Sequence, residues 1–150
     1  MLKEGDKAPD INLANDAGEP FKLSDLKGKR VVLYFYPRAD TPGCTMESCE
    51  FRDDIKAFGK KGVVVLGISP DKPAAQAKFK QKYLLPFTLL ADEEKAAAKA
   101  YGVWKEKNMY GKMVMGIERS TFVIGPDGKI EKIYGKVKAK GHAAAVLAAL

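Results

Sequence analysis

Two cysteines five positions apart are the residues best suited to chemistry in this 150-residue chain. Cys44 follows Thr41-Pro42-Gly43, and Cys49 comes shortly after it. Threonine before proline is typical of a helix start, with Thr41 as the N-cap and Pro42 as the first helical residue. Cys44 then lies in the first turn, beside unpaired backbone N–H groups and the positive end of the helix dipole. Thiols in such surroundings tend to react as thiolates, so Cys44 is either a nucleophile or, like many free cysteines, a small buried hydrophobic residue.

The spacing of the pair excludes several kinds of site. On a continuous helix, five residues separate the Cα atoms by about 8.6 Å, whereas a disulfide tolerates at most about 7 Å. Bonding of Cys44 to Cys49 therefore requires local unwinding. The spacing also differs from the Cys-x-x-Cys of dithiol exchangers. Zinc would need four ligands, and the chain adds only the distant His142 to its two cysteines. We expect no metal and no cofactor, which leaves two inert thiols or a redox pair.

Composition and length place the chain in a broad class. It is 46% hydrophobic and 30% charged, which is typical of a globular protein, and we expect one domain over residues 1–150. The longest apolar runs, Val31–Tyr36 and Val63–Ile68, are far shorter than the roughly 20 residues of a membrane span. The polar start of the chain lacks a secretory hydrophobic region. These features predict a soluble, cytoplasmic protein without membrane partners.

The formal net charge is +7, which raises the question of a nucleic-acid partner. Lysines occur in every segment, and the densest basic stretch is Lys136–Lys140. No basic stripe with interleaved aromatic residues and no zinc-finger or RNP-like motif is present. We therefore expect a solvated lysine-rich surface and no nucleic-acid binding, with a weak polyanion or acidic partner as the alternative.

Hydrophobic patterning predicts alternating strands and helices. Continuous apolar runs indicate buried strands over Val31–Tyr36, Val63–Ile68 and Phe87–Leu90. Helices are expected over Pro42–Phe58, Asp71–Tyr83, Glu93–Tyr101 (capped by Asp92) and Lys140–Leu150. Turn signals predict an initial hairpin of Ile11–Ala14 with Pro20–Leu23, and a closing hairpin of Glu118–Ile124 with Ile130–Tyr134. The segment Val103–Gly116 is ambiguous.

This order of elements predicts an α/β fold, with a central mixed sheet and helices on both faces. Among folds of this length it fits a thioredoxin-like sheet with an N-terminal β-hairpin extension. Ligands in such sheets bind at the carboxyl ends of the strands. The loop after Val31–Tyr36, which leads to Cys44, is therefore the expected position of a site.

Three stretches of the sequence resemble one enzyme family. Pro37-x-x-x-Thr41-x-x-Cys44 matches the active-site motif of peroxiredoxins. The longer run Thr41-Pro42-Gly43-Cys44-Thr45-x-Glu47-x-Cys49-x-Phe51-Arg52-Asp53 is similar to the Q class, also called bacterioferritin comigratory protein. Two further stretches agree, Tyr101-Gly102-Val103-Trp104 through Met109-Tyr110-Gly111, and Gly116-Ile117-Glu118-Arg119-Ser120-Thr121-Phe122. The resemblance covers the chain from about Gly5 to His142.

The resemblance implies a monomeric thiol peroxidase that reduces hydrogen peroxide and organic hydroperoxides. Cys44 would attack the peroxide and become a sulfenic acid. Cys49 would resolve it to an intramolecular disulfide, which thioredoxin or a glutaredoxin-like reductant would reduce. Pro37 would shield the sulfenate, and Thr41 would orient the peroxide. Arg119 would stabilise the thiolate and the charge on the separating oxygens.

Without the resemblance, several residues have simpler interpretations. An arginine that opens a strand, as Arg119 does, is normally exposed. Glu47 and Arg52 are expected to make surface polar contacts, and His142 is not expected to be a general base. A cluster rich in methionine is expected to be core or pocket wall, and its members are Trp104, Met109, Met113 and Met115.

Two other functions remain open from the residues alone. A thioredoxin-like dithiol–disulfide exchanger without peroxidase activity would use Cys-x-x-Cys, which the chain lacks. A binding module or holdase that works through the basic surface would not depend on either cysteine. Consumption of stoichiometric hydrogen peroxide with loss of two thiols separates the peroxidase from both.

Overall fold

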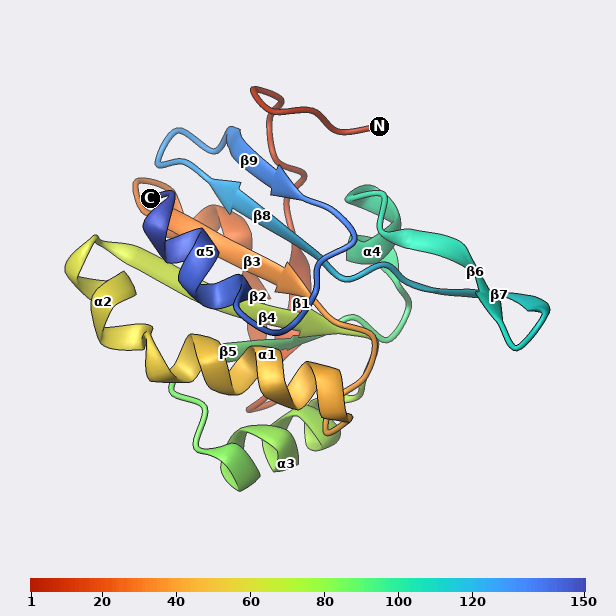
Figure 1. Ribbon diagram of the computed structural model, residues 1–150. Coiled ribbons are helices and arrows are strands. Elements are labelled where there is room, and N and C mark those ends of the chain that lie inside the picture. Colours follow the sequence, from red (N-terminus) through yellow and green to blue (C-terminus); the bar gives the residue numbers. More distant parts are fainter.

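A seven-stranded mixed sheet forms the centre of the protein in a computed structural model that describes residues 1–150 (Figure 1). The strand order is β2-β1-β5-β4-β3-β8-β9. The strands are β1 (Asn12–Asn15), β2 (Pro20–Lys22), β3 (Arg30–Phe35), β4 (Val63–Ser69), β5 (Thr88–Ala91), β8 (Ser120–Ile124) and β9 (Ile130–Tyr134). β3, β4 and β5 are parallel neighbours, whereas β8 runs antiparallel to β3. The predicted mixed sheet and N-terminal hairpin are therefore present.

Alternate residues of β3 point into two separate cores. Val32 and Tyr34 lie in a core with residues of α1 (Pro42–Asp53), α2 (Ile55–Lys60), α3 (Pro73–Tyr83) and α5 (His142–Ala148). Val31, Leu33 and Phe35 face the other core, which includes residues of α4 (Ala96–Ala100). Because both faces are covered, β3 is an almost entirely apolar strand.

Some element boundaries differ from the sequence prediction. The helix expected over 42–58 is two helices, since α1 ends at Asp53 and α2 begins at Ile55. The helix expected from Glu93 begins later, because the Asp92 carboxylate accepts the N–H groups of Ala97 and Ala98 instead of those nearer to it. Residues Leu23–Leu26 form a short 3-10 helix, so the predicted strand ends before Leu23.

The ambiguous segment forms a two-stranded hairpin of β6 (Trp104–Met109) and β7 (Lys112–Ile117), which projects from the body of the protein (Figure 1). Its turn residues, Tyr110 and Gly111, both have positive φ, as tight hairpin turns require. The prediction of a core or pocket wall is wrong for the three methionines of the hairpin, Met109, Met113 and Met115, which are all exposed. Trp104 alone of that cluster packs against a core. A projecting hairpin has no second layer to cover these side chains.

No helix of the structure combines the length and the apolar character needed to cross a membrane.

Candidate active site

Cys44 lies in the first turn of α1, directly after the loop that leaves the carboxyl end of β3. Thr41 has the extended backbone of an N-cap and Pro42 is the first helical residue, which confirms the predicted helix start. The Cys44 side chain is buried, with 1% of its surface exposed. The backbone N–H groups of Gly43 and Cys44 donate no hydrogen bond within the chain. They are therefore free to donate to a negatively charged group at the thiol.

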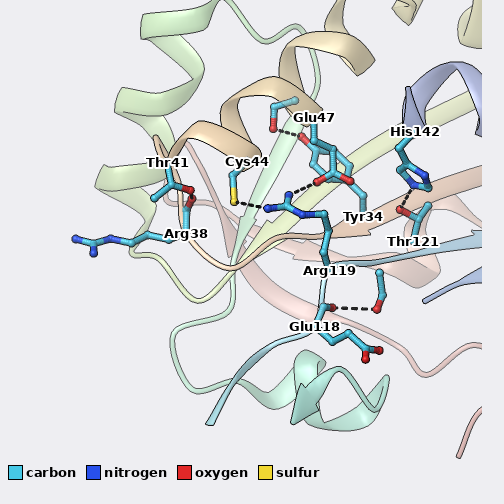
Figure 2. Close-up of polar contacts among 11 residues, drawn as sticks. Tyr34, Arg38, Thr41, Cys44, Glu47, Glu118, Arg119, Thr121 and His142 are labelled. Carbon is cyan, nitrogen blue, oxygen red and sulfur yellow. Dashed lines mark hydrogen bonds and ion pairs between the residues drawn. The ribbon is translucent and has the colours of Figure 1, made fainter. Parts of the chain in front are cut away.

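Arg119 reaches Cys44 from a distant part of the chain (Figure 2). Its Nη2 lies 3.4 Å from Cys44 Sγ, and its Nη1 lies 2.7 Å from Glu47 Oε1. Arg119 immediately precedes β8, and Ser120 of β8 pairs with Phe35 at the end of β3. This pairing brings Arg119 to the loop before α1. The expectation of an exposed arginine is therefore wrong, since only 16% of its side-chain surface is accessible.

Gly43 leaves the space that the guanidinium occupies. A Cβ atom at this position would lie 3.0 Å from Arg119 Nη2, closer than most real contacts of such atoms. Any larger residue would press on the nitrogen that contacts Cys44. Gly43 therefore leaves room for Arg119 Nη2 beside Cys44, and a side chain here would displace that nitrogen by a few tenths of an ångström.

Glu47 is completely buried, contrary to the surface role expected for it. It follows Cys44 by three residues and precedes Phe51 by four, so all three lie on the inner face of α1. One carboxylate oxygen, Oε1, accepts from Arg119, while Oε2 has no hydrogen-bond partner. Burial raises the pKa of the Glu47 carboxyl to about 7, against the opposing effect of the Arg119 charge. The sequence signal for the burial of Glu47 was its helical spacing from Cys44 and Phe51, which places it on the same face of the helix.

Thr41 and Pro37 occupy the loop between β3 and α1. Thr41 Oγ1 donates a hydrogen bond of 2.8 Å to the carbonyl oxygen of Arg38 and does not cap the helix. Its hydroxyl hydrogen is thus engaged, whereas its oxygen keeps the capacity to accept. Pro37 is half-buried at the end of the buried β3 segment. The shielding role expected for Pro37 stays a prediction.

Cys49 lies on the same uninterrupted helix as Cys44, and both thiols are free. Its side chain is half-buried, and burial raises the pKa of its thiol while the charge of Arg52 lowers it. Helix geometry separates the two Cα atoms by about 8.6 Å. The two sulfur atoms can bond only after part of α1 unwinds, because a disulfide requires Cα atoms within about 7 Å.

Arg52 is not a simple surface residue. Its Nη1 donates to the carbonyl oxygen of Tyr83 at 2.8 Å, and its Nε contacts the carboxylate of Asp53 at 2.9 Å. The arginine therefore joins the end of α1 to the end of α3.

His142 packs at the start of α5 and is buried. Its Nε2 is 2.8 Å from the hydroxyl of Thr121, and its ring meets the rings of Phe51 and Tyr134 edge-on. Burial, with the charge of Arg119, lowers the pKa of the imidazole to about 4. The ring is neutral at pH 7 and joins α5 to α1 and β8. No cluster of three or more His, Cys, Asp or Glu side chains has an arrangement that would hold a metal ion.

Comparison with known proteins gives consistent similarities. The AhpC/TSA family matches residues 4–133. Peroxiredoxin Bcp of Bacillus subtilis is 52% identical over 149 residues, which are 99% of this chain and 95% of that protein. A solved structure of a Xylella fastidiosa PrxQ mutant has a TM-score of 0.94 at 37% identity, covering 99% of this chain and 95% of the other.

A second solved structure is of the Xanthomonas campestris bacterioferritin comigratory protein, in a trapped intermediate/ligand complex that addresses its alkyl peroxide reduction activity. It has a TM-score of 0.89 at 42% identity and covers 93% of this chain and 88% of the other. These similarities confirm the thioredoxin-like fold and the resemblance carried by the three motifs. The chain accordingly belongs to the AhpC/TSA family, among the peroxiredoxins named Bcp or Q.

Proposed function

We propose that Cys44 is the residue with which this peroxidase attacks its substrate, and that hydrogen peroxide and organic hydroperoxides are reduced there. The main support is the contact of Arg119 Nη2 with Cys44 Sγ at 3.4 Å, beside the free N–H groups of Gly43 and Cys44. A buried thiolate needs such donors, since an unpaired buried charge is strongly destabilised. The alkyl peroxide reduction activity of the Xanthomonas campestris relative supports the organic substrates.

The first step forms one S–O bond and breaks the O–O bond of the peroxide. The thiolate of Cys44 attacks the terminal oxygen, and the remaining oxygen leaves as an alkoxide or hydroxide that takes a proton. Arg119 Nη2 and the two free N–H groups donate toward the oxygens as charge develops on them. Thr41 Oγ1 accepts a hydrogen bond from the O–H of the peroxide, because its own hydroxyl hydrogen is donated to the carbonyl oxygen of Arg38. Cys44 is left as a sulfenic acid.

The second step closes the disulfide. Cys49 attacks the sulfenic sulfur, the S–S bond forms, and the sulfenic oxygen leaves as water. Unwinding of α1 must precede this attack, as the helix geometry requires. A dithiol reductant, either thioredoxin or a glutaredoxin-like protein, then restores both thiols by exchange.

The test is consumption of stoichiometric hydrogen peroxide by the reduced protein, with free thiols counted in parallel. Cys44→Ser should abolish consumption, because a serine hydroxyl provides almost no anion at neutral pH. The matched control, Cys49→Ser, should consume peroxide once and form no disulfide. Activity of Cys44→Ser above about a tenth of wild type would exclude Cys44 as the nucleophile. Thiol loss only with a disulfide substrate would instead indicate a dithiol exchanger.

A further inference from the structure

We propose that Tyr83, the last residue of α3, is a positioning residue that holds both ends of α1 and so limits how readily this helix opens for disulfide formation. The inference deepens the proposed function, since it concerns the step in which Cys49 reaches Cys44. It depends on contacts at two places, one before α1 and one at its end.

The first contact fixes the loop before the helix. Tyr83 Oη donates to Asp40 Oδ1 at 2.8 Å, and Lys82 Nζ contacts Asp40 Oδ2 at 2.9 Å. Both carboxylate oxygens of Asp40 are therefore bound by α3. Asp40 has a φ of +59°, in the left-handed region that few residues other than glycine adopt, and it directly precedes the N-cap Thr41. The contacts with α3 stabilise this left-handed conformation and with it the start of α1.

The second contact fixes the end of the helix. Arg52 Nη1 donates to the carbonyl oxygen of Tyr83 at 2.8 Å. That carbonyl is free because α3 ends there, with Leu84 in the left-handed conformation and Leu85 N–H returning to Lys80. Tyr83 thus binds the loop before α1 through its hydroxyl and the end of α1 through its backbone carbonyl.

Tyr83 is itself anchored to the core. Its ring packs edge-on against Phe79, at 5.5 Å between centroids, and Phe79 is buried in the core beneath α1 and α3. Movement of Tyr83 would therefore disturb core packing. Opening of α1 instead has to break its contacts with Tyr83 at one end or the other.

These contacts affect the rate at which Cys49 forms the disulfide with Cys44, and they do not affect the rate of peroxide attack. Neither Tyr83 nor Asp40 hydrogen-bonds to Cys44, and attack takes place in the folded helix, which remains the main form. Loss of one hydrogen bond changes an opening equilibrium by about three- to tenfold. Weakening of the Tyr83 contacts should accelerate disulfide formation by that factor and shorten the life of the sulfenic acid. A second peroxide molecule then over-oxidises Cys44 less often.

The experiment compares wild type with Tyr83→Phe, which removes only the hydroxyl, and with Arg52→Met, which removes the second contact. Tyr110→Phe is the matched control, because Tyr110 is fully exposed and its hydroxyl makes no hydrogen bond. Amide hydrogen exchange of the reduced proteins over residues 41–53 should be about three- to tenfold faster in Tyr83→Phe. Disulfide formation after one equivalent of hydrogen peroxide should accelerate in parallel, with an unchanged rate of peroxide consumption.

Two results would overturn the proposal. One is unchanged exchange over residues 41–53 in both Tyr83→Phe and Arg52→Met. The other is faster exchange that extends equally through the central sheet, which would indicate general destabilisation. Exchange of the reduced protein does not depend on peroxidase activity. Faster exchange without any peroxide consumption would therefore support the role of Tyr83 in limiting the opening of α1, and it would count against the proposed function. In that case the rate of disulfide formation with diamide as oxidant would replace the rate measured with peroxide.

Discussion

Arg119 contacts Cys44 and Glu47 through different nitrogen atoms, so one guanidinium serves a thiol and a carboxyl group together. A planar group with fixed donor directions suits this arrangement, and a lysine could not reproduce it. Glu47 holds the orientation of the guanidinium, and its second oxygen, Oε2, has no hydrogen-bond partner that would compete.

We expect replacement of Arg119 by Met to slow the reaction with peroxide by about two to three orders of magnitude, the usual loss for one donor to a developing anion. Stopped-flow single-turnover kinetics of the reduced protein provide the measurement. Arg38→Met is the control, because it removes the same charge from a side chain that points away from Cys44 (Figure 2). An unchanged rate in Arg119→Met would show that the contact with Cys44 is only structural.

The local sequence predicted Cys44 and Thr41 correctly at the helix start, because an N-cap signal depends only on neighbouring residues. The position of Arg119 could be expected only from the family resemblance. Its contact with Cys44 depends on the pairing of β3 with β8, which no short-range pattern encodes. The contact of Tyr83 with Asp40 was missed for the same reason, since these residues are far apart in the chain.

Contacts with the sheet and with two other helices hold α1 along its length. Ser48 Oγ lies 2.8 Å from the hydroxyl of Tyr34 in β3, and Glu50 Oε1 accepts the N–H of Gly141 at the start of α5. Phe51 is buried between the ring of Tyr34 and that of His142. The helix that has to open for disulfide formation is therefore attached to the sheet, to α3 and to α5.

Oxidation by one equivalent of peroxide should therefore increase amide hydrogen exchange over residues 41–53, while the central sheet keeps its protection. The reason is geometric, because the disulfide requires Cα atoms within about 7 Å and the intact helix holds them about 8.6 Å apart. Hydrogen exchange with mass spectrometry on the oxidised and reduced forms checks this.

Cys49→Ser treated in the same way is the control for this experiment and should keep the exchange pattern of the reduced protein. Identical patterns for oxidised and reduced wild type would mean that α1 does not open, or that Cys49 does not bond to Cys44.

The patterns that predicted the helices could not locate the break after Asp53. Phe51, Ile55 and Phe58 have helical spacing, which is the same for one long helix and for two helices in succession. The hairpin of β6 and β7 was ambiguous for a different reason. Apart from Trp104 and Ile117 at its base, its apolar residues are exposed, so no buried face produces a regular pattern.

Burial shifts the pKa values of two ionisable side chains in opposite directions, so their effects on the stability of the whole protein depend on pH in opposite ways. The pKa of Glu47 is raised from 4.5 to about 7, so the folded protein favours its protonated form. The pKa of His142 is lowered from 6.5 to about 4, so the folded protein favours its neutral form. The Glu47 contribution to stability is fully present below pH 4.5 and is lost as the pH rises to about 7, and that of His142 is lost as the pH falls from 6.5 toward 4. In wild type these two changes in the free energy of unfolding with pH partly cancel.

Variants of each residue should separate the two contributions to the pH dependence of the free energy of unfolding. Glu47→Gln keeps an acceptor for Arg119 and cannot ionise, so its free energy of unfolding relative to wild type should increase as the pH rises from 5 to 8. Urea unfolding of the reduced proteins at several pH values measures the difference. His142→Asn should show the opposite trend: its free energy of unfolding relative to wild type should increase as the pH falls below about 6.5. A difference between Glu47→Gln and wild type that is constant with pH would contradict a buried, titrating carboxyl group.

The distribution of sulfur in the molecule has a consequence for a protein that works in the presence of oxidants. All five methionines, Met1, Met46, Met109, Met113 and Met115, are exposed, and the sulfur of Cys44 is the only one buried in a core. Conversion of a thioether to its sulfoxide disrupts a protein when the side chain is packed inside it. Here the same damage stays on the surface, mostly on the projecting hairpin. In a variant with both Cys44 and Cys49 replaced by Ser, excess peroxide should therefore add oxygen atoms to the mass of the protein without lowering its melting temperature.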